Sequence, residues 1–478
     1  GEIYNYRELK KRLDDKRIIW KTSSDTEVIL EYIVKYGFSE TISMLDGMFA
    51  IAAYCRYDKS LWLARDKFGE KPLYYSRDIN NNFFFCSDIK ALMSSRYYNK
   101  KIDYSTSYDY IRYGYVPDPL CILDKTFKLK PGTILKMNNN KKIIENEYWN
   151  TFSEFIKMRH FIYKGTYNDA LEEVKYRISN AVKTRLISDV PVGAFLSGGI
   201  DSSNLVFSLK ENGIDLQTFS IGFEDHEKNE APFAKEISSN LNTNHYEKIL
   251  TEKDCTDIIP DIIKYYDEPF SDPSQIPTFL LSSFARKKVK VAISGDGADE
   301  LFGGYPRYKN TSDFWKNIEK IPAPLLNNLK GIAKFFSSSN FKIFRSLGKK
   351  IRKFSHTDIE SLYNDELSRW RPDEDIYDAS NITSSFFNKN LNFQNSLLSN
   401  YRYLMLRDFI TYLPSNLLVK IDRASMANSL EVRNPFLDPS LVKFVWSLPD
   451  QYLKKNDMDK IILRDILAKK FSKNIFAR

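Results

Sequence analysis

Two loops rich in glycine and acidic residues contain the side chains of this sequence that could perform chemistry. The first occupies residues 197–203, Ser-Gly-Gly-Ile-Asp-Ser-Ser, directly after the apolar run 192–196 and before a helical pattern. Gly198 and Gly199 permit a tight turn that exposes backbone N–H groups, and the start of the following helix adds a positive dipole end. Residues 197–203 are therefore expected to cradle phosphate oxygens. Further hydroxyl donors stand at Ser197, Ser202 and Ser203.

A carboxylate stands inside this cradle at Asp201. It would repel a phosphate unless it holds Mg²⁺, which prefers carboxylate and phosphate oxygens together. The loop is neither a Walker A loop nor a GxGxxG loop, because neither pattern is present. The alternative interpretation is a Gly-Ser turn that only caps a helix. The whole seven-residue string, placed between a strand and a helix, favours a phosphate site with Asp201 as a metal ligand.

The second loop covers residues 294–305, Ser-Gly-Asp-Gly-Ala-Asp-Glu-Leu-Phe-Gly-Gly-Tyr, and follows the apolar run 290–294. In an open α/β sheet, the loops after neighbouring parallel strands share one crevice, so this loop can face Asp201. Asp299 is a candidate second Mg²⁺ ligand, and Asp296 is a candidate base or ammonia-binding group. The alternative is an Asx-type turn followed by a helix.

Two different periodicities divide the chain into regions that must position these loops. Residues 1–150 contain short strand-like runs separated by turns, which predict a layered antiparallel α+β domain. The runs include Met48–Tyr54, Leu61–Arg65 and Thr133–Met137. The polar segment Thr151–Thr166 is the expected boundary.

From Tyr167 the pattern becomes helical, with Ala170, Val174, Ile178 and Val182 at four-residue steps. Strand-like runs then alternate with helical patterns, which predicts a parallel, doubly wound sheet. These runs are 192–196, 217–221 and 290–294. Residues 310–400 are rich in Lys, Ser and Asn and give the weakest signal.

Composition excludes several classes of protein. The chain has 478 residues, enough for more than one domain, and its hydrophobic share of 42% indicates packed interiors. A net charge of +9 spread along the chain indicates a solvated surface and not a nucleic-acid site. No apolar run is long enough for a membrane span, and no signal peptide opens the chain. The sequence leaves open whether the protein forms a homodimer.

The number and spacing of the cysteines indicate the redox state of the cellular compartment. The four cysteines form no CxxC pair and no zinc spacing, which fits a reducing cytoplasm and not a disulfide scaffold. They are Cys55, Cys86, Cys121 and Cys255.

The two acidic loops resemble the pyrophosphatase-type ATP site of the asparagine synthetase family. Other segments agree in order along the chain, from residue 1 to about 470. Segments that resemble the family's class II glutaminase domain are 1–5, 24–27, 45–50, 64–75 and 87–92, and segments that resemble its carboxyl-terminal part are 418–426, 429–438 and 460–464. The resemblance implies an α/β protein of two domains: an incomplete αββα glutaminase domain of the N-terminal-nucleophile-hydrolase type over 1–150, and an adenine-nucleotide-hydrolase-like synthetase domain over 167–478.

For the synthetase domain, the resemblance implies ATP and Mg²⁺ as cofactors. Lys460 would stand against the α-phosphate, where a mobile ammonium is well suited. The backbone at Phe195 and Ile221, with Ser294 and Gly295, would line the adenine and ribose pocket. Asp201 and Asp299 would hold the metal. Asp296 would lie near the nitrogen of the attacking nucleophile, which is ammonia.

For the amino-terminal domain, the resemblance implies that Glu2 and Asp25 hold the α-ammonium of glutamine and that the Gly1 N–H belongs to an oxyanion hole. The family's catalytic cysteine precedes the point where this chain starts, and the family continues beyond its last residue. The chain is therefore expected to be truncated at both ends and to lack glutaminase activity.

The reaction implied is ATP-dependent amidation of aspartate to asparagine with ammonia from glutamine, through an acyl-adenylate that releases AMP and pyrophosphate. One alternative keeps this chemistry on another carboxylate, such as a sugar acid of a surface polysaccharide. Another is a non-catalytic nucleotide-binding or regulatory relative. Residues 267–274 are expected to line the acceptor pocket, and the pair Glu431 and Arg433 is equally well interpreted as functional or as a structural ion pair.

Overall fold

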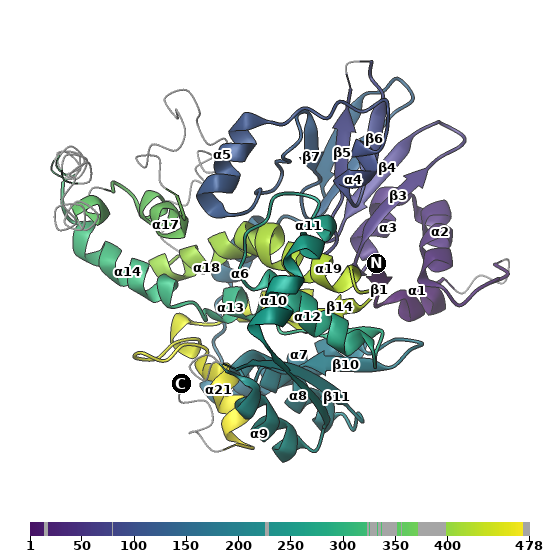
Figure 1. Cartoon of the computed structure of the whole chain (residues 1–478). Coiled ribbons are helices and arrows are strands. Elements are labelled where there is room, and N and C mark those ends of the chain that lie inside the picture. Colours follow the sequence, from purple (N-terminus) through teal and green to yellow (C-terminus); the bar gives the residue numbers. More distant parts are fainter. Residues whose placement is uncertain are drawn as a thin grey trace.

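The computed structural model of the chain describes residues 1–13, 18–78, 80–224, 229–322, 351–354, 356–370 and 398–471, with the single positions 325, 332 and 336. Most of the segment 310–400 lies outside the described residues, as do the last residues from 472 onward. Figure 1 shows an amino-terminal strand-rich region stacked on a region built around β10 and β11. Within the described ranges, no helix combines the length and apolar character that crossing a membrane requires.

The carboxyl-terminal region is built on a five-stranded, all-parallel sheet. Its strand order is β12-β11-β10-β13-β14, with bounds β10 Val192–Phe195, β11 Gln217–Phe223, β12 Asn244–Leu250, β13 Val291–Ile293 and β14 Glu431–Arg433. The chain runs outward from β10 to β12 and then returns to the other side of β10 to form β13. The order therefore reverses between β10 and β13, and the two predicted loops leave the sheet at this switch point.

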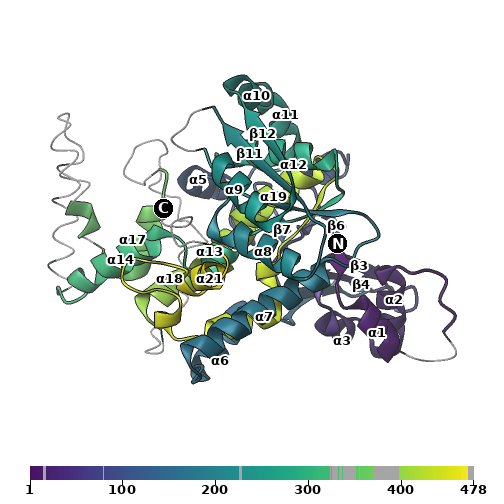
Figure 2. The same cartoon turned by 90° about the horizontal axis from the view of Figure 1, so that it is seen from below.

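Helices cover both faces of this sheet (Figures 1 and 2). On one face α8, Ile200–Glu211, packs against α7, Tyr167–Arg185, and α21, Ile461–Ala468. On the other face α12, Gln275–Arg286, packs against β11 and α19, Leu418–Met426. The predicted parallel, doubly wound sheet is thus correct.

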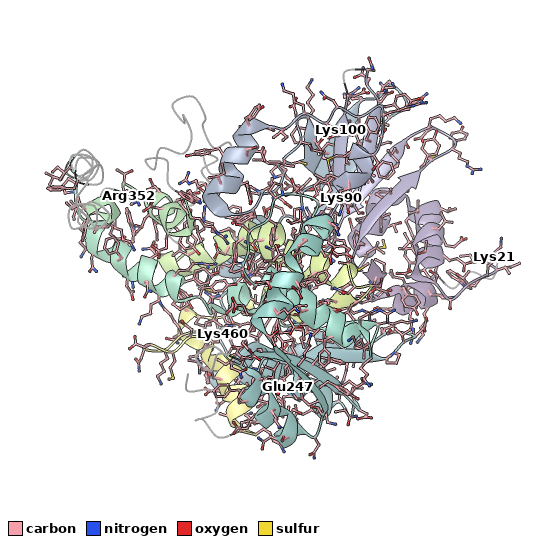
Figure 3. All side chains as sticks on the ribbon, in the orientation of Figure 1. Lys21, Lys90, Lys100, Glu247, Arg352 and Lys460 are labelled. Carbon is pink, nitrogen blue, oxygen red and sulfur yellow. The ribbon has the colours of Figure 1, made fainter. Side chains whose placement is uncertain are left out.

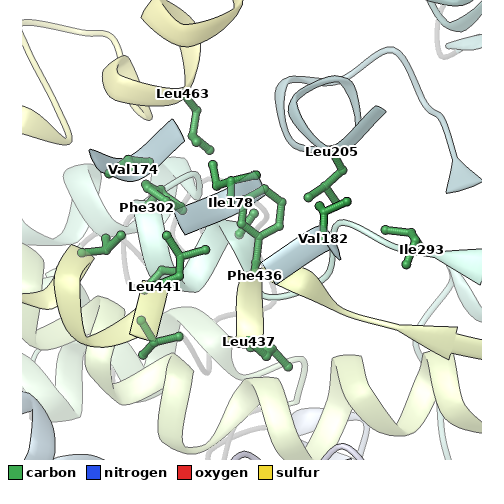
Figure 4. Close-up of a cluster of buried hydrophobic side chains, with 14 of the residues drawn as sticks. Val174, Ile178, Val182, Leu205, Ile293, Phe302, Phe436, Leu437, Leu441 and Leu463 are labelled. Carbon is green, nitrogen blue, oxygen red and sulfur yellow. The ribbon is translucent and has the colours of Figure 1, made fainter. Parts of the chain in front are cut away.

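Apolar spacing explains why α7 lies where it does. Its capping box pairs Thr166 with Asp169, and its apolar residues recur every four positions on one face. Figure 4 shows this face meeting neighbouring elements, with Val174, Ile178 and Val182 near Leu205, Ile293, Phe436 and Leu463. The helix is therefore fixed by burial of its apolar stripe against α8 and the core of the carboxyl-terminal region.

The amino-terminal region forms four layers, helices, sheet, sheet and helices. One antiparallel sheet has the order β3-β4-β8-β9 and the other has the order β6-β5-β7. Leu63, Leu73, Leu129 and Leu135 fill the space between the two sheets. The bounds are β3 Ala50–Tyr54, β4 Leu61–Arg65, β5 Tyr74–Arg77, β6 Phe83–Cys86, β7 Thr126–Lys128, β8 Thr133–Met137 and β9 Ile143–Glu147. The outer helices are α1 Tyr6–Arg12, α2 Asp25–Tyr36 and α3 Phe38–Met44 on one side, and α4 Ile89–Met93 and α5 Tyr104–Tyr113 on the other.

The turn after β4 shows why its sequence reads Arg-Asp-Lys-Phe-Gly-Glu-Lys. The buried carboxylate of Asp66 accepts hydrogen bonds from the backbone N–H groups of residues 68–71 at 2.7 to 3.1 Å. Arg65, also buried, donates to the Asp118 carboxylate at 2.6 Å. A charged hydrogen-bond network therefore fixes this turn, which presents Glu70 and Lys71 to the carboxyl-terminal region.

Buried polar contacts join the two regions. Lys71 Nζ lies 2.8 Å from Asp422, and Asn434 donates to Glu70 at 3.0 Å. Lys128 Nζ lies 2.7 Å from Glu268. Because these partners are far apart in sequence, the interface depends on the fold of both regions.

The polar segment Thr151–Thr166, the expected boundary, contains a helix that packs against the rest of the protein. It contains α6, Thr151–His160, capped by the Asn150 side chain. Phe155 is 1% exposed and packs edge-on against Trp446. Only a few apolar residues of this segment are buried. Its mostly polar composition therefore gave no signal of a helix that packs against the core.

Candidate active site

A cavity of about 520 Å³ opens at the switch point of the parallel sheet. Its lining comes from the loop after β10, the loop after β13, strand β11, helix α12 and the start of α19. Predicted site residues among the lining are Phe195, Ser197, Asp201, Ser202, Ile221, Ser294, Gly295, Asp296 and Asp299. A cavity of this size is within the roughly 300–1,000 Å³ range of small-molecule sites.

The first loop is shaped by its glycines. Gly198 adopts φ +71°, and a Cβ there would lie 2.6 Å from the backbone nitrogen of Ala234. Ser202 Oγ accepts a hydrogen bond from the Ser197 N–H at 3.2 Å, which closes the turn. Gly199 is then the N-cap of α8, so the first N–H groups of that helix point toward the cavity loop.

The second loop lies against the first. A Cβ at Gly295 would meet the Asp201 Cβ at 3.3 Å, so glycine allows the two loops to approach. Asp296 Oδ2 accepts a hydrogen bond from Ser294 Oγ at 2.6 Å, which orients its carboxylate.

Lys460 brings the two loops together electrostatically. Its Nζ lies 2.6 Å from Asp201 Oδ2 and also contacts Asp299 Oδ1. Lys460 is 7% exposed and precedes α21 in the left-handed backbone conformation, at φ +53°. A non-glycine residue in this conformation is typical of sites where surrounding structure imposes the geometry. Figure 3 labels Lys460 at the start of α21, beside the parallel sheet.

Burial shifts the acidity of the site. Burial raises the pKa of Asp201 to about 6, and the Asp299 carboxylate adds to the effect while Lys460 opposes it. Burial also opposes the charge of Lys460, but the two carboxylates outweigh it and raise its pKa. Burial, with the Asp299 charge, raises the pKa of Glu300 to about 8. Such perturbed acids and bases in one cavity are typical of functional sites.

The donor set fits Mg²⁺. Asp201 Oδ1 is buried and has no hydrogen-bond partner within the described residues, and Asp299 shares the same ammonium. Mg²⁺ commonly binds through one or two carboxylates and substrate phosphates, so these two side chains suit it.

Four residues predicted for this site do not line the cavity. Gly198 and Gly199 shape the turn, and Ser203 is fully buried within α8. Lys460 is also absent from the lining and reaches the site through its two carboxylate contacts. The role of Ser203 in a phosphate cradle stays a prediction, and the structure places this residue buried within α8.

Other lining residues escaped the sequence reasoning. Glu300 and Tyr305 belong to the acidic loop itself, and the Tyr305 hydroxyl donates to Glu300 at 2.8 Å. Lys420 stands in the quoted segment 418–426, so its motif offered a signal. Further lining residues are Ser220, Phe223, Glu230, Pro277, Thr278, Leu281, Leu417 and Ile421.

Residues 267–274, the predicted acceptor segment, contact the amino-terminal region and not the cavity. Asp267 accepts from Arg423 at 2.6 Å and from the Ile89 N–H at 3.2 Å, and Glu268 accepts from the Ile122 N–H at 2.8 Å. Its first two acids therefore hold the interface with the amino-terminal region. None of residues 267–274 lines the 520 Å³ cavity, whereas Pro277 and Thr278 of the following helix α12 do.

In the amino-terminal region the structure brings Glu2 and Asp25 together. Asp25 Oδ2 accepts from the Ile3 N–H at 3.1 Å. Glu2 lies in β1, Glu2–Ile3, which pairs with β2, Gly47–Met48, and Gly1 packs against the Met48 carbonyl. Burial and the Glu431 charge raise the pKa of Glu2.

The contacts of Arg433 favour the interpretation of the Glu431–Arg433 pair as a structural ion pair. Arg433 is 2% exposed, lies 2.6 Å from Glu431, and donates to the carbonyls of Arg185 and Ile187. It also lies 3.6 Å from Glu2, which connects β14 to the amino-terminal carboxylates.

Comparisons with known proteins agree with this geometry. The model of the family described as "Asparagine synthase" matches residues 173–478, and that of the "Glutamine amidotransferase domain" matches residues 1–149. The chain is 33% identical to "Asparagine synthetase [glutamine-hydrolyzing] 1" of Bacillus subtilis, over 97% of this chain and 71% of that protein. It is 35% identical to "Putative asparagine synthetase [glutamine-hydrolyzing] 2" of Methanocaldococcus jannaschii, over 89% of this chain and 80% of that protein. The chain therefore belongs to the asparagine synthase family.

Proposed function

We propose that this protein is a ligase that uses ATP to convert a carboxylate, with aspartate as the preferred acceptor, into an amide. The observation that carries the proposal is the pair of loops at the switch point, whose Asp201 and Asp299 share the buried ammonium of Lys460. The family membership and the likeness to named asparagine synthetases support the choice of acceptor.

The chemistry begins with activation of the acceptor. An oxygen of the acceptor carboxylate forms a bond to the α-phosphorus of ATP, and the bond to pyrophosphate breaks. Negative charge grows on the phosphate oxygens during this attack, and fixed cations nearby lower its energy. Lys460 would supply such a cation, with Lys420 on the opposite part of the lining.

Asp201 and Asp299 would hold Mg²⁺, which would supply further positive charge to the phosphates. With Mg²⁺ held by these two carboxylates, the ammonium of Lys460 would be available to the α-phosphate. In the structure the Asp201 and Asp299 carboxylates raise the pKa of Lys460 against the effect of burial, so its side chain carries a positive charge.

The second step forms the amide. The ammonia lone pair attacks the acyl carbon of the adenylate, AMP leaves with the carbon–oxygen bonding pair, and the nitrogen loses a proton. Asp296 is the proposed acceptor of that proton, because it lines the cavity and its carboxylate is oriented by Ser294.

We further propose that residues 1–150 form a glutamine-binding domain and residues 167–478 form the synthetase domain. Glu2 and Asp25 would bind the α-ammonium of glutamine. Their proximity, and the link from Glu2 through Arg433 to β14, support this assignment.

The test is pyrophosphate release from ATP with ammonium chloride and a panel of carboxylates that includes L-aspartate and uronic acids. Asp201→Asn should keep the fold and lose most of the activity, since Asn cannot replace the carboxylate charge. Lys469→Ala, an exposed lysine near the end of α21, is the control. Near-normal turnover of the Asp201 variant would contradict the assignment.

A further inference from the structure

A second, polar pocket of about 210 Å³ lies beyond one wall of the ATP cavity and shares no lining residue with it. We name it the arginine pocket. Its lining residues are Tyr113, Tyr115, Arg307, Glu366, Leu367, Arg369, Tyr412 and Asn416. Two guanidinium groups surrounded by tyrosine rings are a donor set that suits a planar oxyanion.

Arg307 forms the inner wall of this pocket. It belongs to α14, Pro306–Ile318, and donates to the fully buried Asp408 at 2.6 Å and to the Tyr363 hydroxyl at 2.8 Å. Its guanidinium carbon lies 4.0 Å from the centre of the Tyr305 ring and 4.9 Å from that of Tyr412. The guanidinium is therefore locked in one orientation, with the remaining edge available to the pocket.

Arg369 forms the outer wall. Its Nη1 donates to the Ser271 carbonyl and, at 2.7 Å, to the Ser271 hydroxyl, while its backbone N–H donates to the Arg112 carbonyl at 2.7 Å. Gly114 leaves the space for it, since a Cβ there would lie 2.7 Å from the Arg369 guanidinium carbon. This exposed side chain is thus held by two separate segments.

The charge balance of the arginine pocket is positive. Arg307 is neutralised by Asp408, and Glu366 lies 3.1 Å from Lys353. Within the described part of the chain, Arg369 forms no ion pair with an acid, so its charge is uncompensated. An anionic ligand would complete the set.

The arginine pocket is coupled to the ATP cavity by two shared supports. Tyr305 lines the ATP cavity, and the Arg307 guanidinium stacks on its ring. The π-helical turn Leu413–Leu417 places Asn416 in the arginine pocket and the next residue, Leu417, in the ATP cavity. Such π-turns are frequent at functional sites. Ser271, which holds Arg369, belongs to the predicted acceptor segment.

We propose that the arginine pocket binds a small carboxylate-type oxyanion, and that the non-reacting carboxylate of the acceptor is its source. A volume of 210 Å³ is below the roughly 300–1,000 Å³ of drug-sized sites and suits an anion of amino-acid size. The choice of source rests on the proposed function, whereas the anion site itself stands on the geometry alone.

The first test measures binding. L-aspartate and succinate are titrated calorimetrically into the whole chain, with and without AMP, for the unsubstituted protein, Arg369→Gln and Arg307→Lys. Loss of one charge-assisted contact at an exposed site should weaken binding roughly tenfold for Arg369→Gln. Lys316→Gln, which removes the same charge from the exposed face of α14, is the control. Equal affinities in all variants, or no binding by the unsubstituted protein, would overturn the proposal.

The second test identifies the source of the anion. If the acceptor supplies it, Arg369→Gln raises the KM for aspartate in ammonium-dependent pyrophosphate release roughly tenfold and leaves kcat nearly unchanged. Weaker succinate binding with an unchanged KM for aspartate would overturn the acceptor as source and make the ligand a separate anion. Absence of pyrophosphate release with every carboxylate would refute the proposed function, and the calorimetric result would still decide the anion site.

Discussion

The cavity at the switch point of the parallel sheet and the Glu2–Asp25 region hold their acids in different ways. In the cavity, the buried ammonium of Lys460 contacts both Asp201, whose side chain is 22% exposed, and Asp299, at the switch point of the parallel sheet. At the amino-terminal site, the Glu2 side chain is 36% exposed and Asp25 accepts from the backbone of a two-residue strand. Charge interactions are stronger where water is excluded. The difference supports our proposals that transition-state chemistry belongs to the first region and that the second binds a polar ligand near the surface.

The largest expected effect is on Lys460. Lys460→Ala should lower kcat for pyrophosphate release on the order of a hundredfold or more, because the lost charge opposes negative charge that grows in the transition state. The KM for ATP should change much less. Lys469→Ala is the matched control on the same helix. An effect confined to KM would reduce Lys460 to ground-state binding and would weaken the contrast between the regions.

A smaller effect is expected at the interface that joins the two regions. Lys128→Met leaves the buried Glu268 carboxylate without its ammonium partner, and breaking a buried ion pair in this way costs about 3 kcal/mol of unfolding free energy. Urea unfolding measures the loss. Lys264→Met, which removes an exposed pair with Asp261, should cost less than about 1 kcal/mol. Equal costs for the two variants would mean that the regions are not held together by this contact.

The sequence predicted the local parts of the site and missed the parts set by long-range packing. Residues 197–203 and 294–305 lie directly after their strands, so a short pattern and the rule for parallel sheets located Asp201, Asp296 and Asp299. Lys460 was found only by family resemblance, because a single lysine carries no pattern of its own. The arginine pocket was not predicted. Its walls join residues from α5, α14 and the π-turn, and no spacing in the sequence reveals that Arg369 meets Gly114.

The fold followed a similar division. Alternating strands and helices predicted the parallel sheet, and Thr133–Met137 agrees with β8 at both ends. The helix α6 was missed, because its few buried residues, Phe155 and Arg159, meet partners almost three hundred positions later. Periodicity reports a continuous stripe and not such isolated anchors.

A third effect concerns the pH dependence of stability. Burial and the Asp66 charge raise the pKa of Glu70 from 4.5 to about 8, so the folded state binds this proton more tightly than the unfolded state. Between these two values the folded chain holds more protons, and stability falls as pH rises. Glu70→Gln keeps the neutral form beside Asn434 and should flatten the fall in melting temperature between pH 5 and about 8. An unchanged slope would contradict this.

The smallest effect is expected from the thiols. Burial raises the pKa of Cys86 to about 12 and also raises the pKa of Cys121 and Cys255. Such thiols are poor nucleophiles. We expect iodoacetamide to leave ammonium-dependent pyrophosphate release of residues 1–478 unchanged and this polypeptide to form no glutamate from glutamine. Glutamine turnover that iodoacetamide abolishes would place a reactive thiol in the amino-terminal region.

The central claim is that the cavity activates a carboxylate at the α-phosphorus of ATP. The most direct measurement is the product balance when the protein is incubated with ATP, Mg²⁺, ammonium chloride and L-aspartate. The account predicts AMP, pyrophosphate and asparagine in equal amounts, with none formed by the Lys460→Ala variant above a small residual rate. Formation of ADP and inorganic phosphate, or AMP release that does not depend on any carboxylate, would contradict it.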